Sequence, residues 1–347
     1  YLMADMKYLL IDSHALLYSG YFAMLRNPLR AKDGTNTSGI FHLLREIIDK
    51  NESREPDVTV AVFDFPSPSF RVRMYPMYKA NRPSMPDELR AQSEFARKLI
   101  PALGFPLLEK EGYEADDIIA WLTQEAAARG NTVEILSSDK DLLQLAGDNV
   151  RIIRPGKGTK PETIVEKDDV KNIIGVRADQ VADFLSLTGD SSDNVPGAKG
   201  IGPKTALKLL NEFQSIDGIY GAINHVLPLS IRSKLETSRD MVHLSRKLIS
   251  LIPAAAVNIS LDDITMNPPD RALSSEILTS LGMQSILDKL GFKPVGDLFG
   301  GWGGNASSDW CSAFTVSSLD ELRKIDFADS ENGILAFDTE TTSKQPD

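Results

Sequence analysis

"KYLLID", residues 7–12, decides the fold, because it is a short, almost wholly apolar run that ends in an aspartate. Two later runs have the same form, "VTVAVFD" at 58–64 and "TVEILSSD" at 132–139. Apolar runs of this length are typical of strands that are buried on both faces of a parallel sheet. Helical patterns lie between them, at 40–50 and 87–104. The alternation predicts an α/β fold with a mostly parallel central sheet flanked by helices.

Each of the three predicted strands delivers one carboxylate at its end, and these are Asp12, Asp64 and Asp139. In open parallel sheets, ligands bind beyond the carboxyl ends of the strands. We therefore expect the three side chains to meet at one edge of the sheet, where they begin a binding site.

The stretch "GYEADDIIAW", residues 112–121, crowds three acids beside residues that must be buried. Its apolar residues recur at helical spacing, so Glu114 and Asp117 share the side of the first turn that adjoins the buried stripe. Asp116 lies about 100° around from Asp117 on an ideal helix, so helix geometry favours it less. Burying like charges together costs several kcal/mol for each unless something neutralises them. The crowding therefore predicts a cation site.

Two short turns add a pair of acids each, Asp139 and Asp141 in "SSDKDLLQL" and Asp190 and Asp193 in "GDSSDNVPG". Carboxylate oxygens suit Mg²⁺ and Mn²⁺. The acids outnumber what one ion needs, which suggests two ions about 3.5 to 4 Å apart, as in phosphodiester cleavage. Any single acid could instead be a strand-end or helix-cap residue. A calcium EF-hand at Asp190 is excluded, because its twelfth position is Ile201 rather than a glutamate.

Composition narrows the class of protein. The 347 residues suffice for two domains or one large one, and no run of about 18 apolar residues exists. We therefore expect a soluble, intracellular protein without a membrane partner.

Cys311 is the only cysteine and the four histidines lack zinc-ligand spacing, so any metal is expected to be bound by oxygen. The net charge of -11 disfavours nucleic acid on average, but the nine acids named above account for most of it.

The segment "SFRVRMYPMYKANRPSMP", residues 69–86, interleaves basic and aromatic residues. Basic groups can follow phosphates while aromatic rings stack on unpaired bases, so the pattern favours contact with single-stranded nucleic acid. A solvated loop with partly buried side chains is the alternative. The candidate residues are Arg71, Arg73, Tyr78, Lys79 and Arg82.

The stretch "VPGAKGIGPKTALKLL", residues 195–210, predicts a tight glycine turn that opens a helix. Backbone NH groups at such a helix start can hold a phosphate without reading sequence, helped by Lys199 and Lys204. A Walker A loop is excluded, because Pro203 separates Gly202 from Lys204 and no strand precedes the turn.

Six stretches then carry a family resemblance: "LLIDSHALLY", "VFDFPSPSFR", "YKANRPSMP", "GYEADDIIA", "SSDKDLLQL" and "LTGDSSDNVPGAKGIGPKTA". In this order and at this spacing they resemble the 5′ nuclease domain of bacterial DNA polymerase I, within the flap endonuclease superfamily, over about residues 6–293. The resemblance implies a 5′ nuclease or PIN-like core with a helical arch and a helix-hairpin-helix-type subdomain. It also implies one metal site that contains Asp12, Asp64, Glu114, Asp116, Asp117, Asp139, Asp141, Asp190 and Asp193.

The resemblance assigns further roles. Tyr78, Lys79 and Arg82 are expected to be catalytic residues in a flexible arch over threaded single-stranded DNA, where Lys79 and Arg82 position or neutralise the scissile phosphate. Arg71 and Arg73 are expected to contact DNA. Residues 195–208 look like the element that grips duplex DNA. Its expected contacts are Gly197, Lys199, Gly200, Gly202, Lys204 and Thr205.

The carboxyl-terminal part adds a second resemblance. "AFDTETTS", with Asp338 and Glu340, resembles the opening motif of the 3′-5′ exonuclease domain that follows in polymerase I. We expect neither 3′-5′ exonuclease nor polymerase activity from this chain. The expected domains are an α/β nuclease core at 1–180 with the arch at about 69–100, a helical DNA-binding subdomain at 181–293, a glycine-rich linker at 294–309 and a truncated exonuclease-like start at 310–347.

Together with these patterns, the resemblance implies a structure-selective 5′ nuclease that uses two Mg²⁺ or Mn²⁺ ions to cleave 5′ flaps and RNA primers in lagging-strand processing and repair. Expected partners are DNA with a flap, nick or junction and RNA-DNA hybrids, bound by a monomer at the nucleoid in bacterial cytoplasm. A non-catalytic junction binder and a metal-dependent phosphatase for small substrates are the alternatives. A small substrate needs neither the basic-aromatic segment nor the glycine turn.

Overall fold

The computed structural model describes residues 6–156, 158, 160–251 and 259–293, which belong to one compact unit. The predicted linker at 294–309 and the motif with Asp338 and Glu340 lie outside the described residues. Among the residues that the structure describes, no helix has both the length and the apolar character that crossing a membrane requires.

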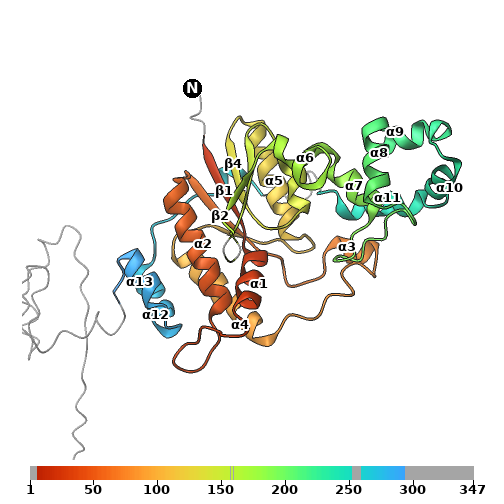
Figure 1. Cartoon of the computed structure of the whole chain (residues 1–347). Helices are drawn as coiled ribbons and strands as arrows, with labels where there is room; N and C mark the ends of the chain where they lie inside the picture. Colours follow the sequence, from red (N-terminus) through yellow and green to blue (C-terminus); the bar gives the residue numbers. More distant parts are fainter. Residues whose placement is uncertain (1–5, 157, 159, 252–258, 294–347) are drawn as a thin grey trace, which may run out of the picture. The chain divides into compact units, whose positions relative to one another are not determined.

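A six-stranded sheet forms the centre of the unit, with the strand order β3-β2-β1-β4-β5-β6 (Figure 1). The strands from β3 to β5 are parallel, and only β6 pairs antiparallel to its neighbour. The prediction of a mostly parallel sheet is confirmed, and the three predicted strands lie at its centre. The strands are β1 (Lys7–Asp12), β2 (Val58–Val62), β3 (Leu107–Leu108), β4 (Thr132–Leu136), β5 (Val150–Arg154) and β6 (Thr163–Val165).

Helices cover both faces of the sheet. Successive side chains of a strand point to opposite faces, so β1 contributes to an apolar cluster on each face. Leu9 and Ile11 of β1 lie in an apolar cluster with residues of α1, α2 and α4. Leu10 lies in a second cluster, on the other face, with Ile118 and Ile119 of α5. The covering helices are α1 (Ser13–Ala23), α2 (Ser38–Arg54), α4 (Asp87–Ala102) and α5 (Ala115–Ala128).

Beyond β6 the described chain is helical (Figure 1, green). Leu187, Leu210 and Val242 are buried in the same apolar cluster as Leu10 of β1, so the helical part and the sheet share one core. The helices are α6 (Val170–Ile174), α7 (Val181–Thr188), α8 (Pro203–Phe213), α9 (Ile216–Gly221), α10 (Leu229–Thr237) and α11 (Arg239–Ile249). The short 3₁₀ helices are η1 (Asp141–Leu145), η2 (Lys167–Asp169), η3 (Ala178–Gln180), η4 (Ile223–His225) and η6 (Leu261–Asp263).

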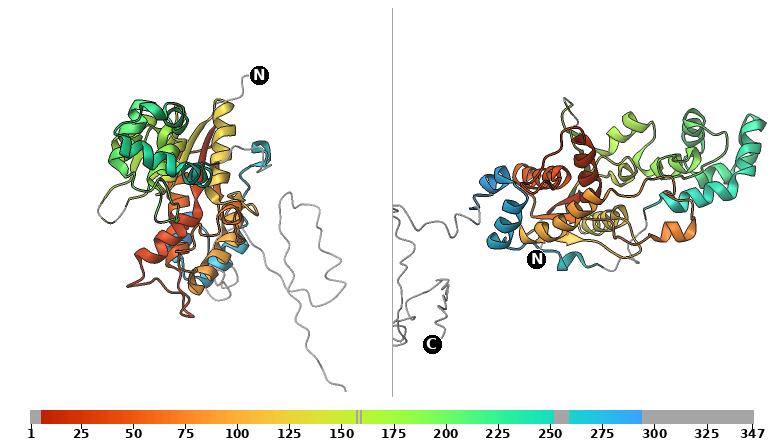
Figure 2. Two further views of the ribbon diagram at one scale, coloured as in Figure 1. Left: turned by 90° about the vertical axis from the view of Figure 1, so that its right-hand side faces the viewer. Right: turned by 90° about the horizontal axis from the view of Figure 1, so that it is seen from below.

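The last two helices differ from the prediction that 181–293 forms one helical subdomain. α12 (Arg271–Ser280) and α13 (Gln284–Leu290) return to the α/β core and pack on the α4 side (Figures 1 and 2, blue). The amide of Asn267 donates to the carbonyl of Gly104 at 2.9 Å. Gly104 has a φ of +90°, and a Cβ there would lie 2.1 Å from the Asn267 carbonyl oxygen. This close backbone approach explains the glycine and fixes the return of the chain.

The predicted arch segment begins with α3 (Phe70–Met74) and ends in α4. Between these helices, residues 75–86 form turns and extended chain rather than a helix. Figure 1 shows this connection running from α3, below α11, to the start of α4. The arch segment therefore spans from the helical part of the unit to the sheet.

Candidate metal centre and nucleic-acid contacts

The first acid of the site, Asp12, ends β1 and also caps α1. Its carboxylate accepts hydrogen bonds from the Ala15 amide at 3.1 Å and from the Ser137 hydroxyl at 2.6 Å. Burial, together with the nearby carboxylates of Asp139 and Asp64, raises the pKa of Asp12 to about 7, against the lowering effect of the Ser137 hydrogen bond. The strand-end aspartates therefore meet at one edge of the sheet, as their positions predict.

Asp116 joins these strand-end residues. Burial raises its pKa well above the ordinary value, and the carboxylates of Asp139, Asp12 and Asp64 add to the effect. The Ala115 amide donates to Asp64 at 2.7 Å, which fastens the start of α5 to the strand ends. We call the four acids Asp12, Asp64, Asp116 and Asp139 the strand-end cluster.

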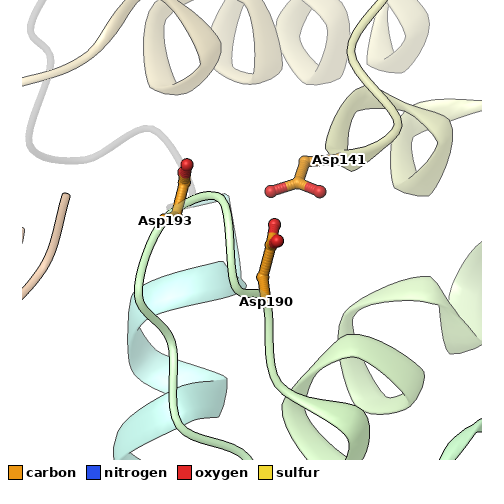
Figure 3. A group of neighbouring side chains, drawn as sticks. All are labelled: Asp141, Asp190 and Asp193. Carbon is orange, nitrogen blue, oxygen red and sulfur yellow. The ribbon is translucent and has the colours of Figure 1, made fainter. Parts of the chain in front are cut away.

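A second group, Asp141, Asp190 and Asp193, forms the loop cluster, with one oxygen of each carboxylate within 4.8 Å of the others (Figure 3). Asp141 begins η1, whereas the other two lie in the turn between α7 and α8. Burial raises the pKa of Asp141 to about 7, together with the charges of Asp139 and Asp190. Among the described residues, Asp141 Oδ1 is buried without a hydrogen-bond partner. A buried carboxylate oxygen that faces two other carboxylates fits a hard cation.

Glu114 connects α5 to the arch segment. Its Oε2 accepts hydrogen bonds from Lys79 Nζ at 2.9 Å and from the Tyr78 hydroxyl at 3.1 Å. The same hydroxyl lies 3.3 Å from Asp193 Oδ2, and Arg82 pairs with the other oxygen of Asp193. Burial lowers the pKa of Lys79, but Glu114 and Asp193 outweigh it and hold this pKa above its usual value. The arch segment thus places a protonated lysine between two predicted metal ligands.

Asp117 differs from the other acids because a basic residue occupies both of its oxygens. Arg71 donates to Asp117 Oδ2 at 2.6 Å and to Oδ1 at 2.7 Å, and both side chains are buried. Arg71 Nε also donates to the carbonyl of Leu248 at 2.6 Å. The prediction that Arg71 contacts DNA is wrong for this structure, because its guanidinium lies in the interior and bonds to protein. Asp117, predicted as a metal ligand, is the buried partner of this arginine.

The glycine turn has the geometry that its sequence predicts. Gly197 and Gly200 have φ values of +67° and +78°, and a Cβ on Gly197 would lie 2.3 Å from a backbone nitrogen. Gly202 caps α8, and the side chains of Lys199 and Lys204 are exposed. Among the described residues, the amides of Gly200 and Gly202 have no protein acceptor. Of the remaining predicted DNA contacts, Arg73 is exposed and Thr205 is half-buried in the first turn of α8.

Three residues near the clusters did not emerge as candidates from sequence. Lys140 Nζ lies 3.0 Å from Asp190 Oδ2, and the Ser137 hydroxyl bonds to Asp12. His14 Nε2 lies 3.6 Å from Asp64 Oδ2, and burial lowers the pKa of this histidine. Each is within two positions of a predicted ligand, so adjacency in the sequence was the available signal. Residue type alone gives no such signal, because serine, lysine and histidine have many structural roles.

Family models match nearly all of the described chain. A model described as "5'-3' exonuclease, N-terminal resolvase-like domain" matches residues 7–175, and "5'-3' exonuclease, C-terminal SAM fold" matches 176–272. The chain belongs to the 5′-3′ exonuclease family. The resemblance stated from the six sequence motifs is therefore confirmed.

Curated relatives agree with this family. The 5′-3′ exonuclease of Aquifex aeolicus is 34% identical over 81% of this chain and 94% of its own length. DNA polymerase I of Caldicellulosiruptor bescii is 36% identical over 84% of this chain. DNA polymerase I of Pseudomonas aeruginosa is 32% identical over 98% of this chain. The chain spans about a third of the length of these two polymerases, 34% and 38% respectively.

Solved structures share the fold. A zinc-bound T5 5′-exonuclease has a TM-score of 0.58 at 20% identity, over 82% of this chain and 96% of that chain. The catalytic core of Rad2 in complex with DNA substrate has a TM-score of 0.56 at 16% identity, over 83% of this chain and 94% of that chain. The predicted fold class is confirmed by both similarities.

Proposed function

We propose that this chain cleaves phosphodiesters in 5′ flaps and RNA primers, with divalent metal ions, and leaves 5′-phosphate products. One observation carries the proposal: among the described residues, Asp141 Oδ1 is buried without a hydrogen-bond partner, in a side chain that lies with the carboxylates of Asp190 and Asp193. Such a concentration of negative charge is unfavourable until cations neutralise it. Membership of the 5′-3′ exonuclease family supports the reaction class.

Two Mg²⁺ or Mn²⁺ ions are the proposed cofactors, since magnesium and manganese prefer oxygen ligands. The strand-end cluster would hold one ion and the loop cluster the other, and Glu114 is linked to Asp193 of the loop cluster through Tyr78 and Lys79. When bound, such ions supply Lewis-acid stabilisation of the charge on the attacking and leaving oxygens. We assign Asp117 to the support of α5 rather than to metal binding, because Arg71 occupies both of its oxygens.

The basic residues of the arch segment are proposed to act on the phosphate. Lys79 and Arg82 already lie beside acids of the site, so a phosphate at the clusters comes within reach of both cations. Their charges would neutralise the scissile phosphate as negative charge develops on it. Tyr78 would remain a neutral hydrogen-bond donor, because burial and the charge of Glu114 hold its pKa above the ordinary value.

Duplex DNA is proposed to contact the glycine turn. The amides of Gly200 and Gly202, with Lys199 and Lys204, suit a phosphate held without base recognition. Shape at a flap, nick or junction would then select the cutting position. The Rad2 catalytic core was solved with DNA substrate, which supports DNA as the partner. A monomer that acts on DNA and RNA-DNA hybrids at the bacterial nucleoid is the corresponding cellular proposal.

Cleavage of an end-labelled 5′-flap substrate tests the proposal. We expect a single-stranded product in Mg²⁺, none in EDTA, and none from Asp64→Ala in Mg²⁺. Intact flap with folded wild-type protein in Mg²⁺ would contradict it. Junction binding without product in either buffer would instead identify a binding module, and hydrolysis of a generic phosphomonoester faster than of the flap would identify a phosphatase.

A further inference from the structure

The arch segment is fastened to the turn that carries Asp193. The side-chain amide of Asn194 donates to the carbonyl of Met77 at 2.6 Å, and that of Asn81 donates to the carbonyl of Ser191 at 2.8 Å. Between them, the backbone amide of Lys79 donates to the carbonyl of Asp193 at 2.9 Å. These three bonds join segments that are more than 100 residues apart in sequence.

The backbone at this contact is held in an uncommon conformation. Lys79 has a φ of +55° and Asn194 a φ of +56°. Asparagine tolerates the left-handed region, but lysine does so at a cost, and the surrounding structure must compensate for it. The amide of Arg82 donates to the carbonyl of Lys79 at 3.0 Å, so both cations belong to the turn that this conformation sets.

We propose that Asn81 and Asn194 are positioning residues that hold Lys79 and Arg82 over the loop cluster. This inference rests on the proposed function, because it assigns these two cations to the scissile phosphate. Both asparagines are suited to the task, since a side-chain amide can donate to a backbone carbonyl, whereas a carboxylate cannot. The exposed position of Asn81 implies that its bond serves the turn rather than the stability of the core.

The ion pairs of Lys79 could hold the turn without the asparagines, and substitution separates the two cases. Asn194→Gly removes the amide and keeps the freedom of a positive φ. Asn81→Ala removes the other bond. Asn149→Gly is the matched control, because Asn149 is exposed just before β5, at the opposite edge of the sheet from the clusters. Thermal unfolding of each variant reports whether its fold is kept.

Single-turnover cleavage of a 5′ flap in Mg²⁺ measures the effect. We expect each asparagine substitution to slow cleavage about tenfold, because a misplacement of about 1 Å can cost about a hundredfold and the ion pairs of Lys79 and Arg82 remain. Duplex binding in EDTA and the wild-type rate of Asn149→Gly are expected to persist. Unchanged rates for Asn81→Ala and Asn194→Gly would overturn the inference, while wild-type protein that cuts no flap would overturn the proposed function instead.

A double-mutant cycle with Lys79→Ala separates positioning from general support of the fold. If the asparagines act through the arch cations, each substitution costs less in the Lys79→Ala background than in the wild type. Fully multiplicative losses in the two backgrounds would show that the asparagines act independently of Lys79 and would contradict the assignment. Either asparagine variant suffices for the cycle, so the experiment still gives an answer if the other variant misfolds.

Discussion

The two acidic clusters differ in what balances their charge. The strand-end cluster accepts hydrogen bonds from neutral donors, such as the Ser137 hydroxyl on Asp12 and the Ala115 amide on Asp64. Within the described ranges, no lysine or arginine forms a salt bridge with Asp12, Asp116 or Asp139. The loop cluster is instead paired with side chains of the protein: Lys140 with Asp190, and Arg82 with Asp193.

The negative charge of the strand-end cluster is therefore largely unbalanced by basic side chains, whereas that of the loop cluster is partly balanced by them. The sheet and the first turn of α5 bring the strand-end acids together, so their repulsion is present whenever the protein is folded. At the loop cluster, Arg82 of the arch segment and Lys140 supply positive charge, so part of the repulsion is balanced without a metal ion. We therefore expect substitutions at the two clusters to differ in magnitude and in their dependence on metal concentration.

The largest effect is expected at the strand ends. Asp139→Asn removes one negative charge from the cluster and should lower the single-turnover rate on a 5′ flap by roughly a thousandfold or more, since preorganised charge at a reacting centre has effects of this order. Junction binding in EDTA should persist, and melting temperature in EDTA should rise, because repulsion is relieved. Equal losses of binding and cleavage would show that Asp139 has a structural role instead.

Removal of an arch cation comes next. Lys79→Ala should slow single-turnover cleavage by about a hundredfold, because the scissile phosphate loses a neutralising charge. Binding of duplex without a flap should change little, since Lys79 lies at the acids and not at the glycine turn. Lys140→Ala is the matched control, because it removes a cation that pairs with the loop cluster from outside the arch segment. A rate for Lys79→Ala equal to that of the wild type would contradict a role for the arch segment in the reaction.

The strand-end cluster could be predicted from sequence because its cause is local. Three apolar runs each end in an aspartate, and parallel strands bring their carboxyl ends to one edge. It was harder to predict which acids in the first turn of α5 belong to the site, because the geometry of an ideal helix favours Glu114 and Asp117. The structure instead places Asp116 with the strand ends and pairs Asp117 with Arg71. The position of the first turn against the sheet decides this. The spacing of Glu114 and Asp117 also forms a capping box, in which the Glu114 amide donates to Asp117 Oδ2 at 3.1 Å.

Long-range packing accounts for the other differences. Arg71 follows a surface-like basic pattern, yet its partners Asp117 and Leu248 are 46 and 177 residues away in sequence. In the same way, the apolar stripes of α12 and α13 predict that these helices bury one face, but not which neighbour covers it. In the structure, Gly104 marks the point to which the chain returns, because its positive φ allows the close backbone contact with Asn267.

A smaller and metal-dependent loss is expected at the loop cluster. Asp190→Asn should slow cleavage about tenfold at low Mg²⁺, and excess Mg²⁺ should restore part of the rate, because the remaining acids still bind the ion more weakly. A rate plotted against Mg²⁺ concentration separates this behaviour from that of Asp139→Asn, for which added Mg²⁺ should have little effect. Identical curves for the two variants would remove the distinction between the clusters.

The smallest effect concerns stability without metal. Burial and neighbouring carboxylates raise the pKa values of Asp12 and Asp141 to about 7, so the native protein keeps protons that the unfolded chain releases at lower pH. Where the native state binds more protons than the unfolded state, stability falls as pH rises. In EDTA, the melting temperature should therefore drop from about pH 4, where the carboxyls of the unfolded chain ionise, to about pH 7, and level off above the native pKa values. Asp12→Asn should flatten the profile, and Mg²⁺ should reduce its slope, because a bound cation favours the ionised carboxylates. A profile in EDTA that stays level or rises over this interval would mean that the acids are already ionised at the lower pH, and that the negative charge of the strand-end cluster is balanced within the protein.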